Sequence, residues 1–156
     1  FRLPKPIINR GGCNLSFSGL KTAVLKISKN IKSETEKYNL AASFQKTIED
    51  ILYEKSKVAM EQFEKNTNNK NKSFVIAGGV ASNKKIRKKL INLSIEKNFN
   101  PIFPPINLCT DNAAMIAWVG IEKFKLNLKD KLDFPAKARW PLDEEAPFLK
   151  GPGIKI

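Results

Sequence analysis

The chain has 156 residues, which is enough for one domain with its own hydrophobic core, and 42% of them are hydrophobic. It carries 28 basic residues against 15 acidic ones, and the net charge of +13 suggests an acidic partner such as nucleic acid. Most of these cations are lysine rather than arginine, so a lysine-rich genome would explain the charge equally well. Histidine is absent, which excludes a Ser-His-Asp triad, a Cys-His pair and a HExxH zinc site within this chain.

Three further features concern the location of the chain and whether it is part of a longer protein. The longest apolar run, residues 113–121, is too short to cross a membrane, so we expect no membrane association. The two cysteines, Cys13 and Cys109, form no metal-binding or disulfide pattern, which favours a cytoplasmic location. The chain begins at Phe1 without an initiating methionine, and its first 14 residues are punctuated by proline and glycine. We therefore expect a piece of a longer protein.

The first half of the chain is predicted to be mainly helical. Residues 1–14 indicate a loop with an edge strand at Ile7 and Ile8, and residues 15–17 a short strand. Ser18 is then a plausible N-cap for a helix from Leu20. The apolar face of that helix is expected to consist of Leu20, Val24, Ile27 and Ile31. Apolar residues at helical spacing predict a second, amphipathic helix over residues 40–63.

The stretch from residue 74 to residue 90 has the pattern of a strand, a glycine turn and a helix. A buried strand is predicted over residues 73–77, and Gly78 and Gly79 follow it. A helix then extends to about residue 97. Such an arrangement can bind phosphate, because glycines let the backbone approach a ligand and a helix start offers unpaired N–H groups. A simple turn that needs glycine for its backbone conformation explains the same residues.

A second strand and helix are predicted near the end of the chain. Residues 101–103 indicate a short strand, and Thr110 is a natural N-cap for a helix that ends near residue 124. Asp111 would then lie in the first turn, where a carboxylate suits the helix dipole. The same carboxylate could instead be a catalytic or metal-binding group, although one carboxylate does not make a metal site. Residues 134–142 are expected to be extended and residues 143–156 a tail.

Three segments taken together resemble one family, the TsaD tRNA N6-adenosine threonylcarbamoyltransferases. They are residues 16–22 (SFSGLKT), residues 77–83 (AGGVASN) with Arg87, and residues 109–117 (CTDNAAMIA). Residues 41–45 (AASFQ) and 139–142 (RWPL) also fit the pattern. The resemblance covers about residues 1–142 and matches the C-terminal half of the family, which older usage called a glycoprotease.

The resemblance implies an α/β fold that is helix-rich with a few short strands. Residues 1–142 would be part of a two-lobed, actin-like ATPase domain with ribonuclease-H-like lobes. The implied reaction moves a threonylcarbamoyl group from threonylcarbamoyl-AMP to N6 of the adenosine beside the tRNA anticodon. The resemblance also implies that Gly78, Gly79 and Asn83 bind ATP or threonylcarbamoyl-AMP, and that Asp111 is one ligand of a metal, usually iron. tRNA and accessory proteins of the modification complex would be the partners.

The chain departs from the family in having no histidine, whereas members carry a two-histidine metal motif in their N-terminal half. We therefore expect the 156 residues alone to bind nucleotide weakly and to be inactive. We also expect them to self-associate through apolar faces left exposed. One alternative is a non-catalytic, actin-like scaffold that binds nucleotide. Another is a small-metabolite kinase of the same superfold, which the segment at 109–115 argues against. No protease constellation can be assembled from these residues.

Overall fold

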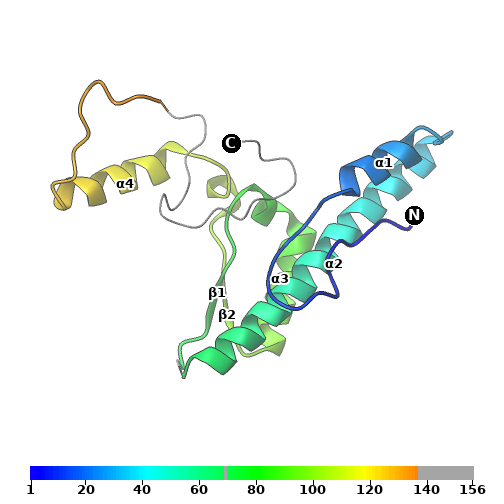
Figure 1. Cartoon of the computed structure of the whole chain (residues 1–156), viewed down its shortest axis with the longest axis horizontal. Coiled ribbons are helices and arrows are strands. Elements are labelled where there is room, and N and C mark those ends of the chain that lie inside the picture. The colour runs from blue at the N-terminus through cyan, green and yellow to red at the C-terminus, as the bar shows by residue number, and fades with distance from the viewer. Residues whose placement is uncertain (69, 137–156) are drawn as a thin grey trace. The chain divides into compact units, whose positions relative to one another are not determined.

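The computed structural model describes residues 1–68 and 70–136 (Figure 1). The described chain is helix-rich with one small parallel sheet, as the α/β prediction requires. Contacts divide it into two compact units, the first spanning Phe1–Ala113 and the second starting at Ala114. The elements, in chain order, are α1 (Leu20–Ser28), α2 (Glu34–Asn66), β1 (Ser73–Val75), the 3-10 turn η1 (Gly79–Ser82), α3 (Lys84–Glu96), β2 (Asn100–Ile102), the 3-10 turn η2 (Ile106–Leu108) and α4 (Ala113–Lys125).

Helix α2 is 33 residues long and begins earlier than its apolar periodicity predicted. The hydroxyl of Ser33 accepts a hydrogen bond from the backbone N–H of Glu36 at 3.2 Å. The carboxylate of Glu36 in turn accepts from the backbone N–H of Lys32 at 2.8 Å. The Ser33 bond satisfies one amide that the first helical turn leaves unpaired, and the Glu36 bond ties the residue before the cap to that turn, so the helix can start in a polar segment.

Strands β1 and β2 pair in parallel, with Ser73 opposite Asn100 and Val75 opposite Ile102. Helix α3 connects them and lies beside α2 (Figure 1). The main core of the unit lies between these elements and contains Met60, Ile86, Leu90, Leu93 and Phe99. The strand is shorter than predicted, and the expectation that it is buried is wrong. Val75 is 62% exposed, because β2 is the sole strand paired with β1 in the described chain.

A second, smaller cluster lies between α1 and the N-terminal half of α2. Leu3, Leu20 and Leu40 form its buried centre, and the predicted apolar face of α1 packs against it. The predicted cap at Ser18 is wrong: the N-cap is Gly19, which has φ 75° and makes no side-chain cap bond. That left-handed conformation favours glycine. The strands expected at residues 7–8 and 15–17 are also absent from the described chain, and residues 6–9 form a turn.

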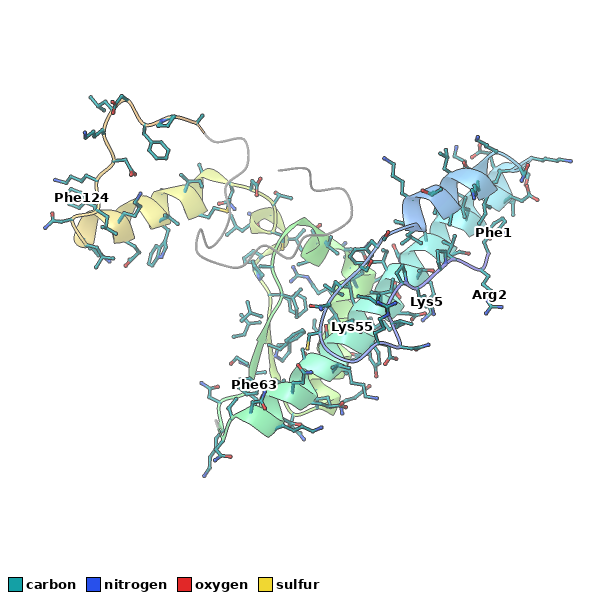
Figure 2. The ribbon with its side chains drawn as sticks, viewed as in Figure 1. Phe1, Arg2, Lys5, Lys55, Phe63 and Phe124 are labelled. Atoms are coloured by element: carbon teal, nitrogen blue, oxygen red, sulfur yellow. The ribbon has the colours of Figure 1, made fainter. Side chains whose placement is uncertain are left out.

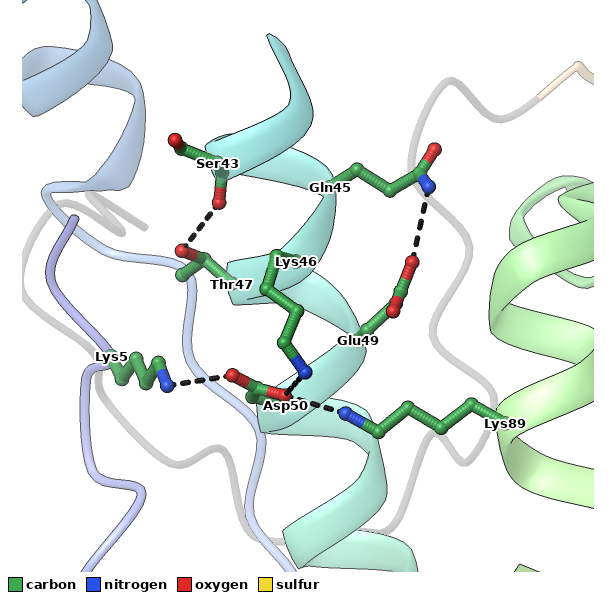
Figure 3. Close-up of polar contacts among 8 residues, drawn as sticks. All are labelled: Lys5, Ser43, Gln45, Lys46, Thr47, Glu49, Asp50 and Lys89. Atoms are coloured by element: carbon green, nitrogen blue, oxygen red, sulfur yellow. Dashed lines mark hydrogen bonds and ion pairs between the residues drawn. The ribbon is translucent and has the colours of Figure 1, made fainter. Parts of the chain in front are cut away.

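Two lysine contacts fasten the N-terminal loop to α2. Lys55, labelled in Figure 2, is 3% exposed. It donates to the carbonyls of Arg10 and Gly12 at 2.6 and 3.2 Å. Lys5 pairs with Asp50 at 2.7 Å, and the same carboxylate accepts from Lys46 and Lys89 (Figure 3). Partial burial raises the pKa of Asp50, but the hydrogen bonds from the three lysines outweigh it and hold this pKa well below its ordinary value.

The second unit contains α4, which ends within one residue of its predicted end. Its apolar side chains face solvent within the described part of the chain, and they include Ile116, Trp118, Val119, Ile121 and Phe124. No helix among the described residues is both long and apolar enough to cross a membrane. The tail predicted at 143–156, and the segment at 139–142, lie outside the described residues.

Candidate functional site

The glycine turn leads from β1 into α3 through the short 3-10 turn η1. Gly78 has φ 87° and ψ 171°, a conformation that a side chain would strain, so one glycine is required by the backbone itself. Gly79 has an ordinary backbone conformation and is exposed. The turn thus presents open backbone beside the start of α3, as a phosphate-binding turn would, although its local geometry already accounts for Gly78.

Asn83 is the N-cap of α3. Its side-chain oxygen accepts from the backbone N–H groups of Lys85 and Ile86 at 3.0 and 3.2 Å. Its side-chain nitrogen donates to the Gln45 amide oxygen on α2 at 3.2 Å. Gln45 donates in turn to Glu49 at 3.1 Å, as Figure 3 shows. The oxygen is engaged by the cap and one N–H by Gln45, which leaves the second N–H of the amide as the donor that could meet a ligand.

Arg87 joins the glycine turn to the segment that carries Asp111. Its Nε donates to the Ala81 carbonyl at 3.0 Å, and one Nη donates to the Pro104 carbonyl at 3.0 Å. The same Nη lies 3.2 Å from the sulfur of Cys109, and the guanidinium stacks 4.6 Å from the centre of the Phe103 ring. The sequence placed Arg87 in a recognised segment but gave no sign that its side chain connects the glycine turn to the segment before Asp111.

The segments around Gly79 and Asp111 lie together, although about 30 positions separate them along the chain. A Cβ atom built on Gly79 would lie 4.0 Å from the methyl group of Thr110. Thr110 does not cap α4 as predicted, because the helix begins at Ala113 and Asp111 precedes its first turn. The Asn112 side chain donates to the Thr110 carbonyl at 2.9 Å, so the chain turns before the helix starts. Asp111 is exposed, with its carboxylate open to solvent.

A metal would need more ligands than this arrangement supplies. Within residues 1–68 and 70–136, no group of three or more histidine, cysteine, aspartate or glutamate side chains is placed to hold a metal ion. Asp111 could contribute one oxygen ligand, and metal ions in proteins are bound by several donors. The described residues therefore do not fit a complete metal site by themselves.

An open groove of about 880 Å³ runs along α2 beside the glycine turn. Its walls are mostly apolar, and its polar end is formed by Gln45, Ser82 and Asn83. The lining residues are Leu15, Phe17, Ala41, Phe44, Gln45, Ile48, Leu52, Gly79, Val80, Ser82, Asn83 and Ile86. Apolar walls with a few polar groups at one end are typical of small-molecule sites.

Comparison with known families gives a match that covers most of the chain. The family model described as "TsaD: tRNA N6-adenosine threonylcarbamoyltransferase" matches residues 1–118. The chain belongs to the TsaD family. The resemblance inferred from the three segments is confirmed. The fold brings the segment at 77–83 beside Thr110 of the segment at 109–117, and Phe17 of the segment at 16–22 lines the same groove as Asn83.

Individual TsaD relatives agree. The chain is 69% identical to the tRNA N6-adenosine threonylcarbamoyltransferase of Pelagibacter ubique, over all of this chain and 44% of that protein. It is 49% identical to the protein of the same name from Rickettsia rickettsii, over 92% of this chain and 43% of the relative. The protein of the same name from Rhodospirillum rubrum is 44% identical, over 98% of this chain and 43% of the relative. The chain thus spans less than half the length of the relatives it matches.

Proposed function

We propose that the polypeptide containing this chain transfers a threonylcarbamoyl group from threonylcarbamoyl-AMP to N6 of the adenosine adjacent to the tRNA anticodon. The observation that carries the proposal is the TsaD family match over residues 1–118, together with a relative of that name 69% identical over the whole chain. The actin-like ATPase fold, the cytoplasmic location and the accessory proteins expected from the family are part of the same proposal.

In this proposal the glycine turn and the start of α3 hold the nucleotide. Gly78 and Gly79 leave the backbone open to the phosphate or ribose, and the Asn83 NH2 group donates a hydrogen bond to the same ligand. The exposure of Gly79 and the groove beside Asn83 support this assignment. Positioning the adenylate in this way would contribute to catalysis by orienting its carbonyl toward the incoming amine.

The reaction needs no nucleophile from the protein. The adenine N6 nitrogen attacks the carbamoyl carbon, so a carbon–nitrogen bond forms and the bond from that carbon to the phosphate oxygen breaks. AMP leaves with the bonding electrons, and N6 loses one proton. The tasks left for this chain are to hold the phosphate and to orient the adenylate, which suits a site built from backbone and amide groups.

Asp111 is proposed as one ligand of a metal, iron by family analogy, whose other ligands come from outside the described residues. A family metal would act as a Lewis acid on an oxygen of the adenylate. The position of Thr110 against Gly79 supports a role for Asp111 near the nucleotide. Because the described residues do not complete a site, no step of the reaction is assigned to the metal.

Asn83→Asp separates the ligand role of Asn83 from its role as a cap. Aspartate also caps a helix well, so α3 should keep its stability, whereas the NH2 donor is lost and a negative charge faces the phosphate. We expect wild-type thermal stability within a few degrees and at least about tenfold weaker adenylate binding by calorimetry. Asn83→Ser, which caps but also lacks the donor, should weaken binding less because it adds no charge. Unchanged binding by both variants would remove Asn83 from the site.

A further inference from the structure

The exposed face at the start of α3 concentrates unpaired positive charge. Lys84, Lys85 and Lys88 are all exposed, and within the described chain none of their ammonium groups has a hydrogen bond or an ion pair. The first acidic residue of this helix is Glu96, at its last position. Cations in the first turn oppose the helix dipole, so this arrangement costs stability rather than adding to it.

Two neighbouring cations of the same helix, in contrast, bind partners within the fold. Lys89 donates to Asp50 at 2.5 Å, and Arg87 bonds the carbonyls of Ala81 and Pro104. Helix α2 likewise carries acidic residues among its lysines, and several form ion pairs. Exposed lysines without acidic partners also occur among the described residues at Lys26 and Lys29, so what distinguishes Lys84, Lys85 and Lys88 is their place on one helix face beside the glycine turn.

These three lysines directly follow Asn83, the proposed nucleotide contact, and the exposed glycine turn. From this placement we infer that Lys84, Lys85 and Lys88, here called the α3 lysine face, bind the phosphodiester backbone of the RNA substrate beside the transfer site. The inference rests on the proposed function, because it takes tRNA as the substrate. Ammonium groups bind backbone phosphates without reading sequence, so the face would dock and orient the RNA and leave its recognition to other groups.

The test is RNA binding by the complete polypeptide that contains this chain, with an unmodified tRNA transcript as the probe. The variant Lys84→Gln/Lys85→Gln/Lys88→Gln removes the α3 lysine face. Its matched control is Lys26→Gln/Lys29→Gln/Lys32→Gln, which removes the same charge from exposed lysines on and just after α1. Dissociation constants are measured by filter binding between about 50 and 200 mM salt, the range over which phosphate contacts change affinity most visibly.

We expect the α3 variant to bind tRNA at least about tenfold more weakly at low salt, and its log–log salt slope to fall by about two to three. The control should stay within about threefold of wild type. If the two triple variants lose the same small amount of affinity, general charge explains it and the inference is overturned. An α3 variant that binds tRNA normally but loses an accessory protein would also overturn it, because the face would then serve an acidic protein.

A binding assay and a transfer assay together distinguish failure of the RNA surface from failure of the proposed reaction. If wild-type protein binds tRNA through this face but forms no threonylcarbamoyl-adenosine, the RNA surface stands and the proposed reaction falls. If wild-type protein is active and the α3 variant keeps both its affinity and its KM for tRNA, the proposed reaction stands and the surface falls.

Discussion

Arg87 gives the sharpest test of how this chain is held together. Replacing it with methionine keeps most of the side-chain length but removes the guanidinium. The substitution removes the hydrogen bonds to the carbonyls of Ala81 and Pro104, both 3.0 Å long, and the stacking on Phe103. The 3-10 turn η1 and the segment leading to Asp111 would then lose the side chain that hydrogen-bonds to both of them.

The size of the effect follows from these contacts. A hydrogen bond from a charged donor contributes about 1.5–3 kcal/mol, and a cation over an aromatic face about 0.5–1 kcal/mol at partly exposed sites. These terms are not additive, and Arg87 is half-buried, so we expect the free energy of unfolding to fall by about 2–4 kcal/mol. Arg87→Lys should recover less than half of that loss, because one ammonium cannot reach both carbonyls with the geometry of the planar fork.

Urea unfolding followed by circular dichroism measures the loss in the purified polypeptide. Lys88→Met is the matched control: its ammonium has no partner in the described chain, so its stability should stay within about 0.5 kcal/mol of wild type. If Arg87→Met also stays within that range, Arg87 does not bridge the two segments, and our explanation of how Asp111 is positioned is wrong.

Three further predictions concern the rest of the chain. Ser33→Ala should lower the free energy of unfolding by about 1 kcal/mol, while Ser33→Asp, which still caps, should not; equal losses in urea unfolding would contradict the cap at the start of α2. The low pKa of Asp50 favours its carboxylate in the folded chain, so this stabilisation is complete above the unfolded pKa of about 3.9 and is lost as the pH falls toward the folded value. Thermal melts should therefore show a decline below about pH 4 that is shallower in Asp50→Asn, and identical pH profiles would exclude the three-lysine contact. The isolated 156-residue chain should self-associate through the exposed apolar residues of α4, and Trp118→Glu/Phe124→Glu should reduce this in light scattering; a wild-type monomer would refute it.

The sequence was most informative where one face of a helix had to be apolar. The faces of α1, α2 and α3 follow from residues such as Leu20, Ile51 and Leu90, since burial at helical spacing leaves a periodic pattern. Short apolar segments did not predict strands reliably. Ile7 and Ile8 have the composition of a strand but form a turn with φ 49° at Ile7, which no local pattern announced.

The candidate site was predicted in part. Gly78, Asn83 and Asp111 were named from the sequence, and the fold brings the segments of Gly79 and Asp111 side by side. The cap role of Asn83 and the bridge made by Arg87 were missed, because both depend on which backbone groups lie nearby in space. The first helix starts at Leu20 as predicted, but the caps predicted at Ser18 and Thr110 were wrong, because a capping residue type acts as a cap only when it directly precedes the first helical residue.

Complementation of cells depleted of their own threonylcarbamoyltransferase tests the central claim most directly, because such cells supply tRNA, threonylcarbamoyl-AMP and accessory proteins. The complete polypeptide containing this chain would be expressed there, and threonylcarbamoyl-adenosine in digested tRNA measured by mass spectrometry. We predict that the modified nucleoside returns with the wild-type protein and is strongly reduced with Asp111→Asn, made at an equal level. If the wild-type protein is abundant and folded, a TsaD control restores the nucleoside, and the wild-type protein does not, the proposed function is wrong.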